Sequence, residues 1–106
     1  MKDIIISGGF NIRAIDLEKT LLEHPDITAA AVIGAPSAQR GEIPVAFVEV
    51  WGPISFNVEA AKNWVNTRLD KQEQIYEMHV MEHMPRSPMG EVLKRELRDK
   101  LSESAL

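Results

Sequence analysis

Runs of apolar residues alternate with polar segments along the chain, and the spacing of the apolar positions predicts both strands and helices. Four runs of β-branched or other apolar residues predict strands, at residues 3–7, 27–34, 43–50 and 76–84. Three segments with apolar residues at helical spacing predict helices, at residues 14–24, 57–70 and 91–103. The paired Gly8 and Gly9 predict that the first strand reverses there into a hairpin.

The predicted strand at 43–50 has two faces of different composition. One face is wholly apolar and consists of Ala46, Val48 and Val50. The other carries Val45 and Phe47, and Glu49 is expected to reach solvent there. The strand at 76–84 is expected to present one apolar face, formed by Met78, Val80 and Met84. The elements predict an α+β fold: a small mixed or antiparallel sheet of about three strands plus an N-terminal β-hairpin, packed with three helices.

Composition narrows the class of protein. The 106 residues suggest one domain, and 44% apolar with 26% charged residues is typical of a folded globular chain. Without cysteine there is no disulfide framework and no thiol nucleophile, which permits a cytoplasmic location. The net charge of −4 comes from interspersed acids and bases, so we expect no nucleic-acid partner. No apolar run reaches the roughly 18 residues that a membrane span requires.

The residues themselves carry only weak chemical signals. His79 and His83 lack the further converging ligands that a metal needs, so we expect edge or surface histidines and no metal site. Gly8 and Gly9 could hold a phosphate through backbone amides, although a plain tight turn is the commoner reason for such a pair. The segment 40–42, Arg-Gly-Glu, leaves a similar choice between ligand contact and surface loop.

Two motifs resemble those of the adenylate-forming enzymes, the superfamily of acyl-CoA synthetases, aryl-CoA ligases, peptide-synthetase adenylation domains and luciferases. Residues 2–12, Lys-Asp-Ile-Ile-Ile-Ser-Gly-Gly-Phe-Asn-Ile, resemble its hinge and the loop that follows. Residues 84–90, Met-Pro-Arg-Ser-Pro-Met-Gly, with the leucines and charges after them, resemble its C-terminal signature. The segments between also follow the family's order, so the resemblance spans residues 2–101 and identifies a C-terminal lid domain.

The resemblance implies a role for each motif. In the family, a large N-terminal domain binds ATP with Mg²⁺ and a carboxylic acid, and the acyl-adenylate formed is passed to coenzyme A or another thiol. The C-terminal domain rotates between these half-reactions about a hinge, which Lys2 and Asp3 match. The thioester loop is matched by Ser7, Gly8, Gly9, Phe10 and Asn11. The signature loop is matched by Pro85, Arg86 and Gly90. No cofactor is expected on this domain alone.

One departure bears directly on activity. The family has a catalytic lysine immediately after the signature glycine, and Glu91 stands there in this chain. Because that lysine offsets charge on the carboxylate and phosphate, a glutamate about 4 Å from phosphate would cost about 4 kcal/mol at an effective dielectric constant near 20. We expect an enzyme with Glu91 to adenylate poorly, which leaves the thioester half-reaction open. An engineered change or a degenerate paralogue would also explain Glu91, and Lys94 is a further candidate to supply the cation.

Two smaller departures concern ligand contacts. The family often has Tyr-Lys-x-Pro after the second helix, where residues 72–75 here are Gln-Glu-Gln-Ile. Phe10 stands where the family usually has glutamate or tyrosine. Because the chain begins inside the hinge motif, we expect an excised domain of 1–106 whose partner is the N-terminal domain of the same enzyme.

Three hypotheses therefore stand side by side. The first is the C-terminal domain of an ATP-dependent acyl- or aryl-CoA ligase, inactive alone. The second is a non-catalytic binding or regulatory module that kept the fold and lost the lysine. The third is an unrelated α+β domain.

Overall fold

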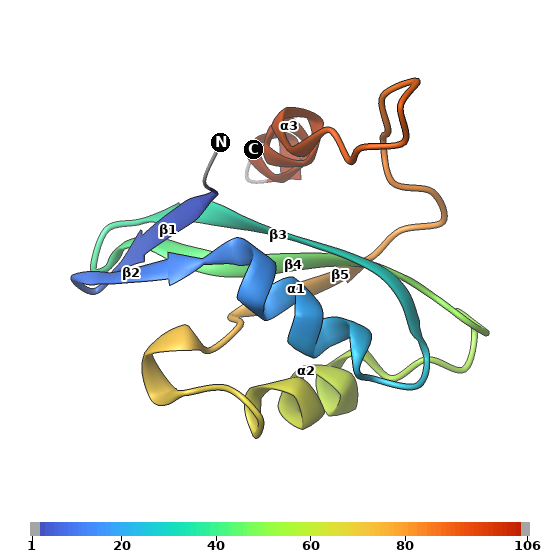
Figure 1. Ribbon diagram of the computed structural model, residues 1–106, viewed down its shortest axis with the longest axis horizontal. Coiled ribbons are helices and arrows are strands. Elements are labelled where there is room, and N and C mark those ends of the chain that lie inside the picture. Colours follow the sequence, from blue (N-terminus) through green and yellow to red (C-terminus); the bar gives the residue numbers. More distant parts are fainter. Residues whose placement is uncertain (1–2, 105–106) are drawn as a thin grey trace.

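The computed structural model describes residues 3–104. Along the chain it has β1 (Ile4–Ser7), β2 (Phe10–Arg13), α1 (Ala14–Leu22), β3 (Ile27–Ser37), β4 (Gly41–Val50), α2 (Val58–Asn66), the short 3-10 helix η1 (Lys71–Glu73), β5 (Glu77–Val80) and α3 (Lys94–Ser104). One five-stranded sheet lies between α1 and α2 on one side and α3 on the other (Figure 1). The predicted α+β fold, with an N-terminal hairpin plus three further strands and three helices, is confirmed.

Strand β4 organises the sheet. Along one edge it pairs antiparallel with β3, from Ile27↔Val50 to Ser37↔Gly41, with an irregularity near Ala29. Its other edge is shared by two strands in succession. Strand β1 meets it at Ser7↔Gly41, and β5 runs parallel to it from Val45↔Glu77 to Val48↔Val80. The sheet is therefore mixed, and β1 connects the β2 strand of the hairpin to it.

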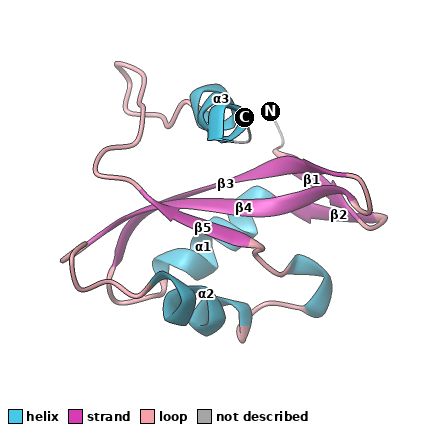
Figure 2. Cartoon of the chain, turned by 180° about the vertical axis from the view of Figure 1, so that it is seen from behind, coloured by secondary structure: helices cyan, strands magenta, loops and turns pink. Residues whose placement is uncertain are grey.

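The two faces of the sheet bury separate cores, and successive residues of β4 alternate between them. The larger core lies under α1 and α2 (Figure 2) and includes Leu17, Leu21, Val32, Ala46, Val48 and Val65. The smaller core lies under α3 and consists of Ala31, Ile33, Ala35, Val45, Phe47, Met84 and Leu97. Leu97 is the one residue of α3 in that cluster of buried side chains, so the helix depends heavily on it.

Several predicted boundaries were wrong. The strand predicted at 76–84 ends at Val80, so Met84 packs in the smaller core while Met78 packs in the larger one. The helix predicted from 91 begins at Lys94, because residues before it pair with the preceding loop through Arg86↔Val92. The helix predicted at 57–70 ends at Asn66.

Glu49 does not simply reach solvent, contrary to the prediction. Its side chain is 23% exposed, and its Oε2 accepts hydrogen bonds from the chain that follows β5. Within residues 3–104, no helix has both the length and the apolar composition to cross a bilayer.

Candidate functional site

The hairpin between β1 and β2 turns on two glycines with left-handed backbone. Gly8 has φ 58° and Gly9 has φ 86°, and Ser7 pairs with Phe10 across them. Positive φ at both central residues is the geometry of a two-residue type I′ turn, which matches the twist of the strands it joins. The Gly8 amide donates to the Arg40 carbonyl at 2.8 Å. The two glycines therefore form a tight turn. The Gly8 amide is already hydrogen-bonded to Arg40.

Arg40 holds this turn in place through hydrogen bonds with Ser7 and Gly8, a role that the sequence patterns did not reveal. Its Nε donates to the hydroxyl of Ser7 at 3.0 Å, and Ser7 is fully buried. Its guanidinium carbon lies 5.9 Å from the ring centroid of Tyr76. A Cβ added at Gly8 would lie 2.6 Å from Arg40 Nη2, whereas one at Gly9 would have no described atom within 4 Å. The missing side chain of Gly8 leaves room for Arg40. The missing side chain of Gly9 leaves the backbone at the tip of the hairpin open to solvent.

We expect Gly8→Ala to destabilise the chain more than Gly9→Ala. Each alanine must adopt left-handed backbone, at a cost of about 1–2 kcal/mol. At Gly8 the new methyl group also displaces Arg40, which leaves the buried Ser7 hydroxyl without its donor and adds about 1 kcal/mol. Urea unfolding of both variants measures the difference, and equal losses would contradict the supporting role of Arg40.

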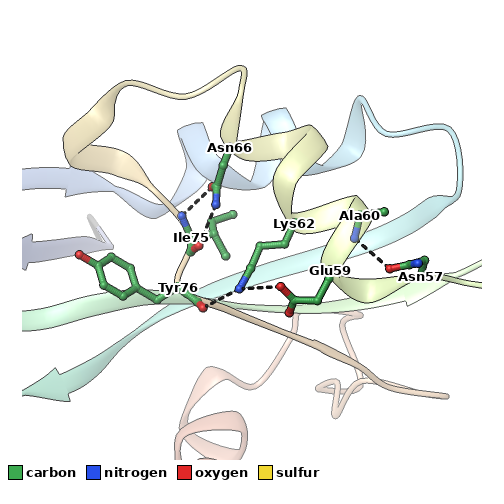
Figure 3. A network of polar contacts seen from close by, with 7 residues as sticks. All are labelled: Asn57, Glu59, Ala60, Lys62, Asn66, Ile75 and Tyr76. Atoms are coloured by element: carbon green, nitrogen blue, oxygen red, sulfur yellow. Dashed lines mark hydrogen bonds and ion pairs between the residues drawn. The ribbon is translucent and has the colours of Figure 1, made fainter.

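Tyr76 is held beside Arg40 by a polar network on α2 (Figure 3). The Asn66 side chain bonds both backbone groups of Ile75, donating to its carbonyl at 2.9 Å and accepting from its amide at 2.8 Å. Lys62 Nζ donates to the Tyr76 carbonyl at 3.2 Å and lies 3.5 Å from Glu59. The network meets the stretch 72–75, where the family often has Tyr-Lys-x-Pro, at Ile75, and it fixes the backbone at residues 75–76.

The other loop predicted from the resemblance, before α3, forms a three-residue turn. The Gly90 amide donates to the Ser87 carbonyl at 2.9 Å, and the Ser87 amide donates to the Glu91 carbonyl at 2.8 Å. Gly90 has φ 90°, as a left-handed residue after a type I turn requires. The Pro85 carbonyl accepts from the Leu93 amide at 2.8 Å, which closes the base of the loop. Glu91 is exposed and is the first residue after the turn.

Glu49 anchors this loop to the sheet. Its Oε2 accepts from the Met84 amide at 2.8 Å and from Arg86 Nη2 at 3.3 Å. Arg86 Nη1 in turn donates to the Gly90 carbonyl at 3.2 Å. A carboxylate at the end of β4 therefore orients the arginine of the loop, and the arginine orients the glycine before Glu91.

We expect Glu49→Ala to loosen residues 84–91 and to lower the free energy of unfolding by about 1–2 kcal/mol, since a hydrogen bond to a charged group contributes this much when one partner is removed. The matched control is Glu82→Ala, whose side chain is 92% exposed and should change stability little. Thermal unfolding measures the loss of stability, and amide exchange at Gly90 measures the loosening of the loop. Equal behaviour of the two variants would contradict an anchoring role for Glu49.

The structure separates the two loops and places Asp3, the described hinge residue, apart from both tips. The hairpin tip and the loop 85–91 lie at opposite ends of the molecule (Figure 1). Lys2 lies outside the described residues. Asp3 accepts from the Ala14 amide through its carbonyl at 3.0 Å and contacts Lys94 Nζ through its carboxylate. Lys94 is thus held near the start of β1 and does not point its charge toward Glu91.

The remaining predicted residues lie on the surface. Phe10 is 50% exposed and Asn11 is exposed, both beside the hairpin tip. His79 stacks on Phe47, with ring centroids 5.1 Å apart, and lies 3.0 Å from Glu77. Across residues 3–104, no three side chains of the metal-binding types come together.

Known proteins resemble this chain over nearly its whole length. The sequence profile of the AMP-binding enzyme C-terminal domain matches residues 16–91. The chain is 33% identical to 4-coumarate–CoA ligase 2 of Petroselinum crispum, over 100% of this chain and 20% of that protein. A fatty acyl CoA synthetase of Mycobacterium tuberculosis superimposes with a TM-score of 0.87 at 31% identity, over 96% of this chain and 20% of that one.

A third relative has a different activity in its name. The amide bond synthetase McbA from Marinactinospora thermotolerans superimposes with a TM-score of 0.85 at 30% identity, over 93% of this chain and 20% of that one. The chain thus spans about a fifth of the length of the relatives it matches. The match of the profile to residues 16–91 confirms the resemblance drawn from the motifs, and the chain belongs to the AMP-binding enzyme C-terminal domain family.

Proposed function

We propose that this chain is the C-terminal lid domain of an ATP-dependent acyl- or aryl-CoA ligase, which forms an acyl-adenylate and then an acyl-CoA thioester. The observation that carries the proposal is the arrangement of the two motif loops. Each is exposed and rigidly supported, and they occupy opposite ends of one unit (Figure 1). A lid that serves two half-reactions needs two such surfaces, presented in turn by rotation about the hinge at Lys2 and Asp3.

The hairpin loop fits a thiol arm. The tip at Gly9 is open, and Gly8 and Gly9 present backbone without side chains. A narrow channel for coenzyme A requires such close approach to backbone, which a Cβ would obstruct. Ser7, Phe10 and Asn11 complete this loop in the proposal. The buried Ser7 and Arg40 hold it in shape.

The signature loop fits ATP poorly. The residue that would face the phosphate is Glu91, whose carboxylate repels an anion. Pro85, Arg86 and Gly90 keep the family's positions, and Arg86 is engaged with Glu49 and the loop itself. We therefore do not expect this loop to stabilise ATP with Mg²⁺. The large N-terminal domain, the proposed partner, supplies those contacts.

The proposed substrates include both aryl and fatty acids. The names of the relatives include both an aryl acid, 4-coumarate, and a fatty acid. A second function, a non-catalytic binding or regulatory module, is favoured by Glu91 alone, because a domain without the family's lysine would support adenylation poorly.

The test starts from the complete reading frame that contains residues 1–106. We expect a large domain upstream, and the full-length protein should convert aryl or fatty acids to CoA thioesters more readily from supplied acyl-adenylate than from acid and ATP. The chain alone is the control and should do neither. An upstream domain without thioester formation would favour the non-catalytic module. A frame confined to these residues would overturn the ligase proposal.

A further inference from the structure

Lys94, the first residue of α3, joins four separate segments of the chain. Its Nζ contacts the carboxylate of Asp3, lies 2.7 Å from Glu18 Oε2 on α1, and donates to the Val32 carbonyl on β3 at 3.0 Å. The side chains of Lys94 and Glu18 are only 21% and 20% exposed. An ammonium group with three acceptors, two of them charged, is fully used as a donor.

The same group of side chains closes an open edge of the sheet. Strand β3 is the last strand of the sheet on its side, so the outward backbone groups of Val32 have no neighbouring strand. Glu18 Oε2 accepts from the Val32 amide at 2.9 Å, and Lys94 donates to the Val32 carbonyl. Two side chains thus replace a strand at this point, which ties α1 and α3 to the sheet edge.

Asp3 is attached at two points. Its carbonyl accepts from the Ala14 amide at the start of α1, and its carboxylate contacts Lys94. A residue held through both backbone and side chain cannot rotate freely relative to the body of the domain.

We infer that Lys94 is a positioning residue that makes Asp3, α1, α3 and the edge of β3 one rigid body, so that Asp3 moves with the domain. The part of this inference that concerns rotation rests on the proposed function. The part that concerns the cluster of Asp3, Glu18, Val32 and Lys94 does not.

The cluster is tested in this chain by amide exchange at Ala14 and Val32, which report its two backbone attachments. Lys94→Met keeps the stem and removes the charge, and should speed exchange at both amides about tenfold, the effect of losing roughly 1.4 kcal/mol. Lys71→Met removes the same charge from an exposed site and should leave both rates unchanged. Lys94→Arg should recover most of the protection. Unchanged exchange in Lys94→Met would overturn the inference.

Positioning is tested in the full-length protein, well below its unfolding temperature, with supplied acyl-adenylate and coenzyme A. Lys94→Met should lower kcat for thioester formation about tenfold and leave the KM for coenzyme A unchanged, because the hairpin loop keeps its shape but is poorly placed. Lys94→Arg should restore kcat. Loss of thermal stability with an unchanged kcat would overturn the positioning role. An inactive wild-type protein with faster exchange in Lys94→Met would reject the proposed function and the rotation but retain the cluster.

Discussion

Replacing Glu91 with lysine is expected to raise the rate of acyl-adenylate formation by the full-length protein by about 10²–10³-fold, the usual effect of one positioned group that stabilises developing negative charge. Glu91 is exposed and directly follows the turn at Gly90, and Arg86 donates to the Gly90 carbonyl. The loop that would carry a lysine is therefore already formed. The new ammonium group would replace repulsion of the phosphate with attraction.

Glu91→Gln separates the two parts of this effect. It removes the repulsion without supplying a cation, so its rate should lie between those of the original protein and the lysine variant. Pyrophosphate release measures adenylation, and thioester formation from supplied acyl-adenylate should be similar in all three proteins. If lysine at this position gives no gain, the assignment of Glu91 to the family's catalytic position is wrong, and the non-catalytic module gains support.

Leu97→Ala is expected to destabilise the smaller core strongly, with a loss of about 3 kcal/mol in the free energy of unfolding. Leu97 is fully buried and packs in the cluster that includes Phe47 and Met84. Truncation leaves a cavity between α3 and the sheet, because those neighbours belong to a strand and a tethered loop that cannot close it. For a domain of about 100 residues this corresponds to a fall in melting temperature of roughly 12–24 °C.

Leu22→Ala is the matched control, because Leu22 also lies on a helix but is 49% exposed. It should cost less than about 1 kcal/mol. Circular dichroism during heating measures both variants, and amide exchange shows whether α3 is lost before the sheet. Equal and small effects would mean that α3 does not depend on Leu97, and that the contacts of Lys94 and Leu101 hold it.

The fold was predictable to the extent that local chemistry decides it. Two adjacent glycines after three isoleucines specify a hairpin, because only glycine takes left-handed backbone at both positions without strain. The apolar face of Ala46, Val48 and Val50 was predicted from the sequence, whereas the second core, around Val45 and Phe47, was seen only in the structure. The predicted boundaries failed where long-range bonds compete with local preference. Residues 91–93 have helical spacing, yet Leu93 bonds back to Pro85.

The two motif loops were predicted from the sequence. The side chains that hold them in place, Arg40 and Glu49, were not. Arg40 lies 33 positions from Ser7, and Glu49 lies 35 from Met84, so no local pattern connects them. The sequence by itself determined the family, the order of elements and the reversed charge at residue 91, because these depend on residue identity and short-range spacing. Only the tertiary structure decided which side chains hold each loop and what Lys94 binds, because those contacts join segments that meet only when the sheet has formed.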